Sequence, residues 1–452
     1  MALAVVIVLL VVGSLIFHFA SPWYFTPLAS NWGTIDFTVD VTFWVCGIVF
    51  VAVNIFSAYC LVKYRHRKGH KAHYEPESKK LEAWLTGVTT VGVAAMLTPG
   101  LFVWGDFVRV PEDAMRFEVL GKQWHWSFRF PGGDAEFGNT DVRLMTPENP
   151  FGVDPTDGAG MDDVIVSEPI VHLPVGTPIE SLLRSTDVLH NFTVPQFRVK
   201  MDLVPGMVTY QWFTPTVPGT YEILCEELCG VGHFAMRGKV VVDEPAAFDG
   251  WLAGKPTFAE TLERPVGNAA AGAATYAVCA ACHGQQGEGN VALNAPKLAG
   301  LDPWYARRQI ANYQAGVRGA DPRDVFGIQM APMSRTLVDA QAVENVLAYI
   351  ATLPDAPAEP TIIGDAERGR ATYMTCAVCH GPAAEGRWGT NAPRLAGMSD
   401  WYLTRQLTNF RERIRGGHET DVYGDQMYML AASLRDEAAI NDVLAYINTL
   451  GP

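Results

Sequence analysis

Apolar residues form three long runs in the first quarter of this 452-residue chain. The first run covers residues 1–20 and contains no Asp, Glu, Lys or Arg, and the others cover residues 38–62 and 83–108. A helix needs about 20 predominantly apolar residues to cross the hydrocarbon core of a bilayer. We therefore predict three transmembrane helices in these segments.

Basic residues between the second and third runs predict how these helices are oriented. The loop of residues 63–80 is rich in Lys and Arg, which accumulate on the cytoplasmic side of membranes. Everything after Val110 is then extracytoplasmic. The first run lacks a basic residue before its apolar core, and Phe17-His18-Phe19-Ala20 is a poor cleavage site, so we expect a retained anchor rather than a cleaved signal peptide. The predicted location is a bacterial inner membrane, with the later domains on the periplasmic side.

The pattern then changes to short β-strands. Four apolar side chains alternate with polar ones, as in a half-buried strand: Trp124, Trp126, Phe128 and Phe130. Turn-rich segments separate further short strands, such as residues 164–166 and 209–213. We predict an all-β domain over residues 114–245, followed by a linker over residues 246–265.

The remainder of the chain contains an internal repeat. Residues 279–284 recur at 376–381, and the offset of 97 residues holds without a gap. Matched pairs include Pro296 and Pro393, Leu298 and Leu395, Trp304 and Trp401, Gln309 and Gln406, Arg318 and Arg415, and Tyr349 and Tyr446. Duplication of one helical module, at residues 266–355 and 362–452, is the simplest account.

Charge and cysteine usage narrow the function. The net charge of −14 argues against binding to nucleic acid and would suit docking of a basic soluble protein. Of the eight cysteines, four lie in two C-x-x-C-H motifs, two lie in one loop of the β domain, and Cys46 and Cys60 lie in the second apolar run. No pair remains for a disulfide framework.

The two C-x-x-C-H motifs predict covalently bound haem c. Two thiols one helical turn apart can react with both vinyl groups of a haem, while the adjacent imidazole binds the iron. A disulfide or a zinc site is the alternative, and repetition at the same offset disfavours it. The predicted attachment residues are Cys279, Cys282 and His283 in the first module, and Cys376, Cys379 and His380 in the second.

The two modules resemble small class I cytochromes c, particularly those with two haems, which implies all-α domains and a distal Met ligand. Each module offers two nearby methionines. The repeat aligns Met330 with Met427, whereas Met333 aligns with Leu430 and Met429 with Pro332. If both modules keep one ligand geometry, Met330 and Met427 are the distal ligands, since a thioether on iron raises the potential of a c-type haem.

Residues 225–236 contain a soft ligand set. The segment offers Cys225, Cys229, His233 and Met236, and the best candidate for a further ligand from elsewhere in the chain is His190. Thiolates, imidazoles and a thioether favour copper over hard cations. A Cys225–Cys229 disulfide, a structural zinc site or a buried core histidine are the alternatives, and Met236 favours copper because a thioether three residues after a His suits copper better than zinc.

The pattern C-x-E-x-C-G-x-x-H-x-x-M resembles the dinuclear copper centre of cytochrome c oxidase subunit II. The resemblance implies a cupredoxin-like Greek-key sandwich in which both Cys bridge two coppers. It implies further ligands at His190, His233, Met236 and the main chain of Glu227, whose side chain would help bind Mg or Mn at the interface with subunit I. It also implies that Trp124 relays electrons, although His125 departs from the family's Gln-Trp-Tyr-Trp sequence. The alternative is that Trp124 and Trp126 simply fill the core of the sandwich.

Together these features predict the electron-entry subunit of a haem-copper oxidase. Electrons would pass from a donor, such as a soluble cytochrome c or an upstream respiratory complex, through two haems c and copper A to subunit I, which reduces oxygen. The extra first helix departs from the family. Alternatives are the corresponding subunit of a copper-containing nitric oxide reductase and a stand-alone membrane-tethered carrier, whereas a quinol oxidase subunit would lack the copper ligands. Glu82 would be either the mouth of a proton path or an interfacial acid.

Overall fold

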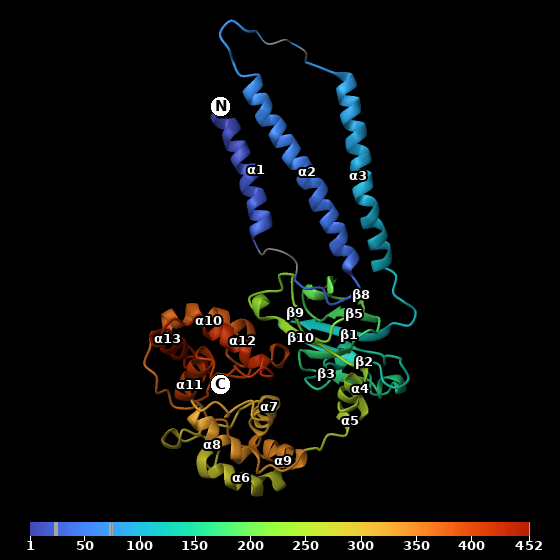
Figure 1. Cartoon of the computed structure of the whole chain (residues 1–452). Coiled ribbons are helices and arrows are strands. Elements are labelled where there is room, and N and C mark those ends of the chain that lie inside the picture. The colour runs from blue at the N-terminus through green and yellow to red at the C-terminus, as the bar shows by residue number, and fades with distance from the viewer. Residues whose placement is uncertain (22–25, 72–73, 75, 452) are drawn as a thin grey trace.

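The three apolar segments are helices in the computed structural model, which describes residues 1–21, 26–71, 74 and 76–451. They are α1 (Ala2–Ala20), α2 (Gly33–Lys63) and α3 (Lys79–Phe107). All three are long and apolar enough to cross a membrane. They extend together from one side of the β domain (Figure 1). The described part of the chain is therefore a membrane anchor followed by globular domains.

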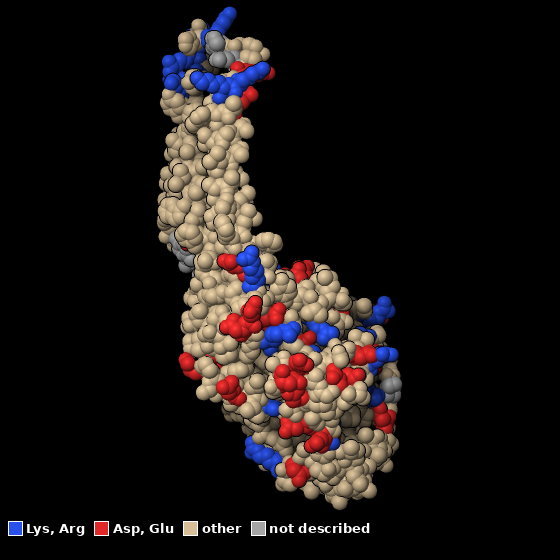
Figure 2. All heavy atoms as spheres, turned by 90° about the vertical axis from the view of Figure 1, so that its right-hand side faces the viewer, with Lys and Arg blue, Asp and Glu red and all other residues tan. Residues whose placement is uncertain are grey.

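The charge distribution on this anchor agrees with the predicted orientation. Figure 2 shows a shaft almost without charged side chains between the charged globular body and a group of Lys and Arg at the far end. That far end is the loop between α2 and α3 (Figure 1). The basic loop and the globular domains thus lie on opposite sides of the apolar shaft, and the β domain is extracytoplasmic.

The β domain is a sandwich of two five-stranded sheets whose strands interleave along the sequence. The first has the order β3-β2-β1-β5-β8 and the second β4-β10-β9-β6-β7. Neighbours are antiparallel except for the parallel pairs β1–β5 and β4–β10. The strands are β1 (Met115–Lys122), β2 (His125–Phe130), β3 (Val164–Val166), β4 (Ile170–Pro174), β5 (Ile179–Ser185), β6 (His190–Val194), β7 (Val199–Leu203), β8 (Thr209–Phe213), β9 (Gly219–Leu224) and β10 (Arg237–Asp243).

Strand β2 is more buried than its alternating sequence suggests. Trp126, Phe128 and Phe130 enter the core between the sheets as expected, but the opposite face of the strand is buried as well. Arg129 on that face pairs with Glu118 and Asp163, so the buried charge is neutralised. The prediction of a half-buried strand was therefore wrong, because a periodicity of two does not reveal what covers the polar face.

Residues 246–265 also differ from the expected linker. They contain helix α4 (Pro245–Ala253) and helix α5 (Phe258–Leu262). Phe248 joins the sandwich core, and the Trp251 ring stacks on His172 at 4.5 Å. Burying these aromatic side chains fastens the segment to the β domain.

Both C-terminal modules are helical, as predicted, and their structures repeat. The first contains α6 (Ala269–His283), α7 (Pro303–Gln314), α8 (Val325–Ser334) and α9 (Ala340–Ile350), and the second contains α10 (Ala366–His380), α11 (Asp400–Arg411), α12 (Val422–Ala431) and α13 (Glu437–Ile447). The first and last helices pack together in each module. The ring centres of Tyr276 and Tyr349 are 5.1 Å apart in the first module, and those of Tyr373 and Tyr446 are 5.4 Å apart in the second.

The two modules are joined by a pair of exchanged hydrogen bonds. Buried Arg318 donates to Gln309 of its own module and to Gln406 of the other. Buried Arg415 does the reverse, donating to Gln406 and to Gln309. Because these positions are equivalent in the repeat, the interface has approximate two-fold symmetry.

Candidate metal and haem sites

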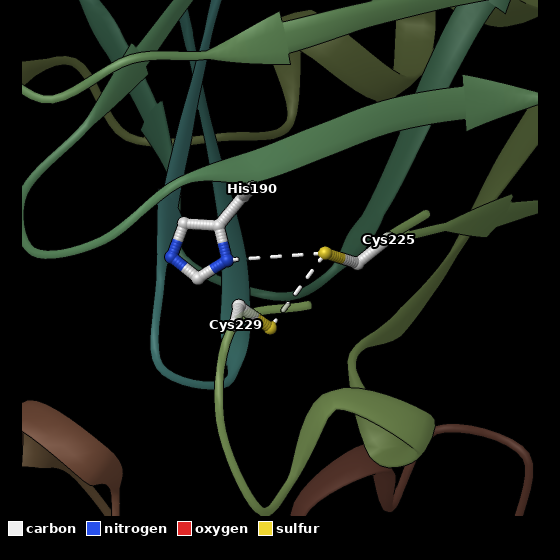
Figure 3. Close-up of side chains that lie close together, drawn as sticks. All are labelled: His190, Cys225 and Cys229. Carbon is white, nitrogen blue, oxygen red and sulfur yellow. Dashed lines mark hydrogen bonds between the residues drawn. The ribbon is translucent and has the colours of Figure 1, made fainter. Parts of the chain in front are cut away.

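The predicted copper ligands lie at one end of the sandwich, on and beside a single loop. Cys225 directly follows β9, and the loop ends where β10 begins at Arg237. His190 is the first residue of β6, which pairs with β9. The sheet thus places a residue that is distant in sequence next to the loop, and Figure 3 shows His190, Cys225 and Cys229 facing one another.

Three of these donor atoms form a compact buried cluster. The two sulfur atoms are 3.7 Å apart, and His190 Nδ1 is 3.9 Å from Cys225 Sγ. The donor atoms of all three residues lie within 4.8 Å of one another. A disulfide has a sulfur–sulfur distance of about 2.05 Å, so these cysteines are a reduced pair available to bind metal.

The remaining proposed donors surround the two sulfurs. His233 Nδ1 is 3.5 Å and Met236 Sδ is 3.8 Å from Cys229 Sγ. The carbonyl oxygen of Glu227 is 3.3 Å from Cys225 Sγ. All six atoms suggested by the sequence therefore converge on one place.

This donor set fits two soft ions better than one zinc ion. A structural zinc site takes four ligands, whereas six donors converge here and the two sulfurs lie among the others. The hydrogen bond between the two sulfurs lowers the pKa of Cys225 and raises the pKa of Cys229, because it stabilises one thiolate beside one thiol. A bound cation would favour loss of the second proton as well.

Asp187 is a supporting residue that the sequence analysis did not identify. Its Oδ1 accepts a hydrogen bond from His190 Nε2 at 2.8 Å, which leaves Nδ1 facing Cys225. Burial lowers the pKa of His190, but Asp187 and Cys225 raise it further, and the net pKa lies above the usual value. A carboxylate behind a ligating imidazole fixes its orientation and strengthens it as a donor.

Trp124 packs directly against residues 225–236, the predicted copper loop. Its Nε1 donates to the carbonyl of Cys229 at 3.1 Å, and Gln123 Nε2 donates to the same oxygen at 2.8 Å. Gly230 and Gly232 make this contact possible. A Cβ on Gly232 would lie 2.5 Å from the indole ring, and Gly230 has a φ of 115° in addition to a close approach.

The C-x-x-C-H histidines are oriented alike in both modules. His283 Nδ1 donates to the carbonyl of Pro296 at 2.7 Å, and His380 Nδ1 donates to the carbonyl of Pro393 at the same distance. The Nδ1 proton leaves Nε2 as the atom with a free lone pair. Burial lowers the pKa of both imidazoles, which favours the neutral form that can bind a metal.

An apolar cavity in the second module supports the haem prediction there. Its lining includes Cys376, Cys379, His380 and Met427 with several Leu and Val side chains, and the first module contributes Leu301, Tyr305, Arg308 and Gln309. Met429 is not among its lining residues. In the first module, Met330 is half-buried, and Met333 is 40% exposed.

Glu82 lies far from all of these groups. It is exposed in the first turn of α3, at the end of the shaft that carries the basic loop.

Comparisons with known proteins agree with this architecture. The family "Cytochrome C oxidase subunit II, periplasmic domain" matches residues 115–244, and the family "Cytochrome c" matches residues 269–354 and 366–451. An alternative cytochrome c oxidase subunit 2 from Bradyrhizobium diazoefficiens is 53% identical over 259 residues, which are 57% of this chain and 94% of that protein.

Two solved structures are similar to separate parts of the chain. The periplasmic domain of subunit II of cytochrome oxidase from Bradyrhizobium japonicum is 28% identical and covers 32% of this chain and 95% of its own, with a TM-score of 0.24. Reduced cytochrome c4 from Pseudomonas stutzeri is 29% identical and covers 41% of this chain and all of its own, with a TM-score of 0.34. On the match to the Bradyrhizobium diazoefficiens protein, over almost that protein's whole length, this chain belongs to the cytochrome c oxidase subunit 2 family.

Proposed function

We propose that this chain takes up electrons at its two cytochrome modules and delivers them, through a dinuclear copper centre, to an oxygen-reducing partner subunit. The family membership supports the general role of the chain, which is the electron-entry subunit of a haem-copper oxidase. The observation that supports the copper centre is the cluster of two thiols, two imidazoles and one thioether, with the Glu227 carbonyl oxygen beside them.

The chain's own residues would hold each group in place. Cys225 and Cys229 would bridge the coppers, with His190, His233, Met236 and the Glu227 carbonyl completing their ligands. Each C-x-x-C-H motif would attach one haem, and Met330 and Met427 would be the distal ligands. When bound, the copper centre and the two haems would each carry one electron at a time. The apolar surroundings of a metal site limit the access of water to it.

A membrane partner is supported by the surface around the copper loop. Leu228, Val231 and Phe234 are 77%, 41% and 52% exposed although they are apolar neighbours in one loop. Exposed apolar patches of this kind mark interaction sites. We propose that subunit I covers this loop in a bacterial inner membrane, and that the Glu227 side chain helps bind Mg or Mn where the subunits meet.

Replacement of one bridging thiolate tests the proposal. In Cys225→Ser, a hydroxyl cannot take the place of a bridging sulfur, so we expect copper to be lost while both haems remain reducible. Copper content and haem spectra of the purified complex measure this result. Cys46→Ser, which changes an exposed thiol on α2, is the matched control and should keep both copper and haem. Normal copper with normal oxygen consumption in Cys225→Ser would contradict the proposal.

A further inference from the structure

The two cytochrome modules are alike in sequence but differ in their surroundings. Helix α12 of the second module packs against the copper loop at η4 (His233–Ala235). In Figure 1 this module lies beside the β domain. The equivalent helix of the first module, α8, exposes the corresponding side chains: Gln329 is exposed, whereas Gln426 is half-buried. One module therefore presents to solvent the face that the other presents to the copper loop.

Hydrogen bonds connect the second module to Trp124. Gln426 Nε2 donates to the Trp124 carbonyl at 2.6 Å, and Trp124 Nε1 donates to the carbonyl of Cys229 at 3.1 Å. Gln426 directly precedes Met427, the proposed distal haem ligand. A short chain of contacts thus runs from the haem-binding helix to a copper-bridging cysteine.

The site of haem attachment shows the same asymmetry. Cys379 packs against the apolar core of the copper domain, whereas its equivalent in the first module, Cys282, is exposed. Lys122 of the copper domain lies 5.1 Å from the centre of the Trp388 ring in the second module. The contact between the second module and the copper domain therefore includes the edge at which the haem would be attached.

His125 also belongs to this interface. Its ring centre is 5.0 Å from that of Tyr423 on α12, and its Nε2 donates to the Ser167 carbonyl while lying 3.2 Å from the Tyr423 hydroxyl. Burial lowers the pKa of His125 to about 3, so the ring is neutral and adds no charge to the interface. The position at which this chain departs from the family sequence is thus the position covered by its own second module.

We propose that the second cytochrome module is the built-in electron donor of the copper centre, and that the first module lies upstream of it. The second module is held beside the copper loop by the contacts of Gln426 with Trp124 and of Tyr423 with His125. This inference rests on the proposed function. A haem held by His380 would give up one electron and be oxidised, and copper held by Cys225 and Cys229 would accept that electron and be reduced. No bond forms or breaks, and no proton moves between the two sites.

The Trp124 environment supports this order. Trp124 is 4% exposed, and α12 supplies the hydrogen bond to its carbonyl. The second module therefore occupies the surface beside the indole. The interface persists in one chain at a fixed effective concentration, so it needs little affinity to remain formed.

Gln426 offers a test with a matched control. Gln426→Leu removes the donor and leaves the Trp124 carbonyl unpaired, and Gln426→Glu places a carboxylate against that carbonyl. An unsatisfied buried acceptor costs about 1–3 kcal/mol, which corresponds to a fall of about 5- to 150-fold in the ratio of docked to undocked module. Gln329→Leu and Gln329→Glu change the equivalent exposed residue of the first module and should not alter docking.

Two measurements on the copper- and haem-loaded chain report the outcome. Hydrogen exchange of residues 225–236 and 422–431 should become about tenfold faster in both Gln426 variants, because exchange follows the opening equilibrium. Electron transfer from haem to copper after flash reduction should become slower in the same variants. Tyr423→Ala, which removes the ring contact with His125, should act in the same direction.

Unchanged exchange and an unchanged transfer rate in the Gln426 variants would overturn the inference, as would equal effects in the Gln329 controls. Metal and haem content of the unmodified chain are measured first. Absence of copper or haem there would contradict the proposed function itself, whereas their presence together with unaltered Gln426 variants would contradict only the role of the second module.

Discussion

Removal of the Asp187 carboxylate should weaken copper binding without unfolding the β domain. Asp187 accepts a hydrogen bond from His190 Nε2 at 2.8 Å, and it also accepts from the backbone nitrogens of Gln123 and Val188, each at 2.7 Å. It therefore fixes both the imidazole and the segment that leads to Trp124. Loss of such a supporting partner typically reduces metal affinity 10–100-fold, or by about 1.4–2.7 kcal/mol.

Two variants separate the contributions of charge and hydrogen bonding. Asp187→Ala removes both, and we expect it to fall within that range. Asp187→Asn keeps an oxygen for His190 but loses the charge, and hydrogen bonds to a charged acceptor are roughly twice as strong as neutral ones. Its amide nitrogen would also face the Gln123 N–H, which is a donor as well. We therefore expect an intermediate loss for Asn.

Copper retention against a graded series of chelator concentrations measures the affinity. Asp243→Asn is the matched control, because Asp243 pairs with His172 at 2.6 Å at the far end of β10 from the copper loop. That variant should retain copper like the unmodified chain. The reasoning fails if Asp187→Ala retains copper equally well, or if Asp243→Asn loses as much copper as Asp187→Ala.

Two further predictions concern the cytochrome modules. Met427→Leu should lower the reduction potential of one haem and remove one of the two methionine-to-iron absorption bands in the far red. Met429→Leu should leave the potentials and the bands unchanged. Redox titration measures the potentials, and a loss in Met429→Leu instead of Met427→Leu would refute the alignment of the repeats. Asp355 accepts from Lys297 at 2.7 Å and from Arg394 at 2.5 Å. Burial raises its pKa, but the two cations lower it further, to a net value below the usual one. This stabilisation exists above the unfolded-state pKa of about 4 and is lost as the pH falls through the folded-state pKa. Asp355→Asn should therefore lower the midpoint of thermal unfolding more at pH 7 than at pH 3, and a difference that is equal at both pH values would exclude the ion pairs as its cause.

Much of the fold could be predicted because its signals are local. Apolar runs of sufficient length identified α1, α2 and α3, and the gapless repeat identified the two helical modules. The linker at residues 246–265 could not be described correctly from composition. Its Pro and Gly residues are typical of a connection, but Phe248 and Trp251 find partners on the sandwich that lie far away in sequence.

The candidate metal site likewise contains residues that the sequence identifies and residues that only the fold brings in. Cys225, Cys229, His233 and Met236 lie in one loop, so their spacing alone brought them to attention. Asp187 acts on a ligand three residues further along the chain, and Asp-x-x-His was a readable signal once His190 had been chosen. The carbonyls of Pro296 and Pro393 were visible only as matched positions of the repeat, because a backbone acceptor leaves no mark in the residue type.

The interface between the copper domain and the second module was the least predictable part, and the reason is the duplication itself. The repeat aligns Gln329 with Gln426 and Phe326 with Tyr423, and Arg405 lies 4.1 Å from the Phe326 ring just as Arg308 lies 4.2 Å from the Tyr423 ring. Sequence similarity therefore predicts equal roles for the two modules. Both copies contact the β domain, the first through the pair of Arg307 and Glu148, and what separates them is which copy meets the copper loop. That depends on the connection through α4 and α5 and on the exchanged hydrogen bonds of Arg318 and Arg415. Two nearly equal modules thus acquire different positions from their packing, and position determines which of them can serve the copper loop.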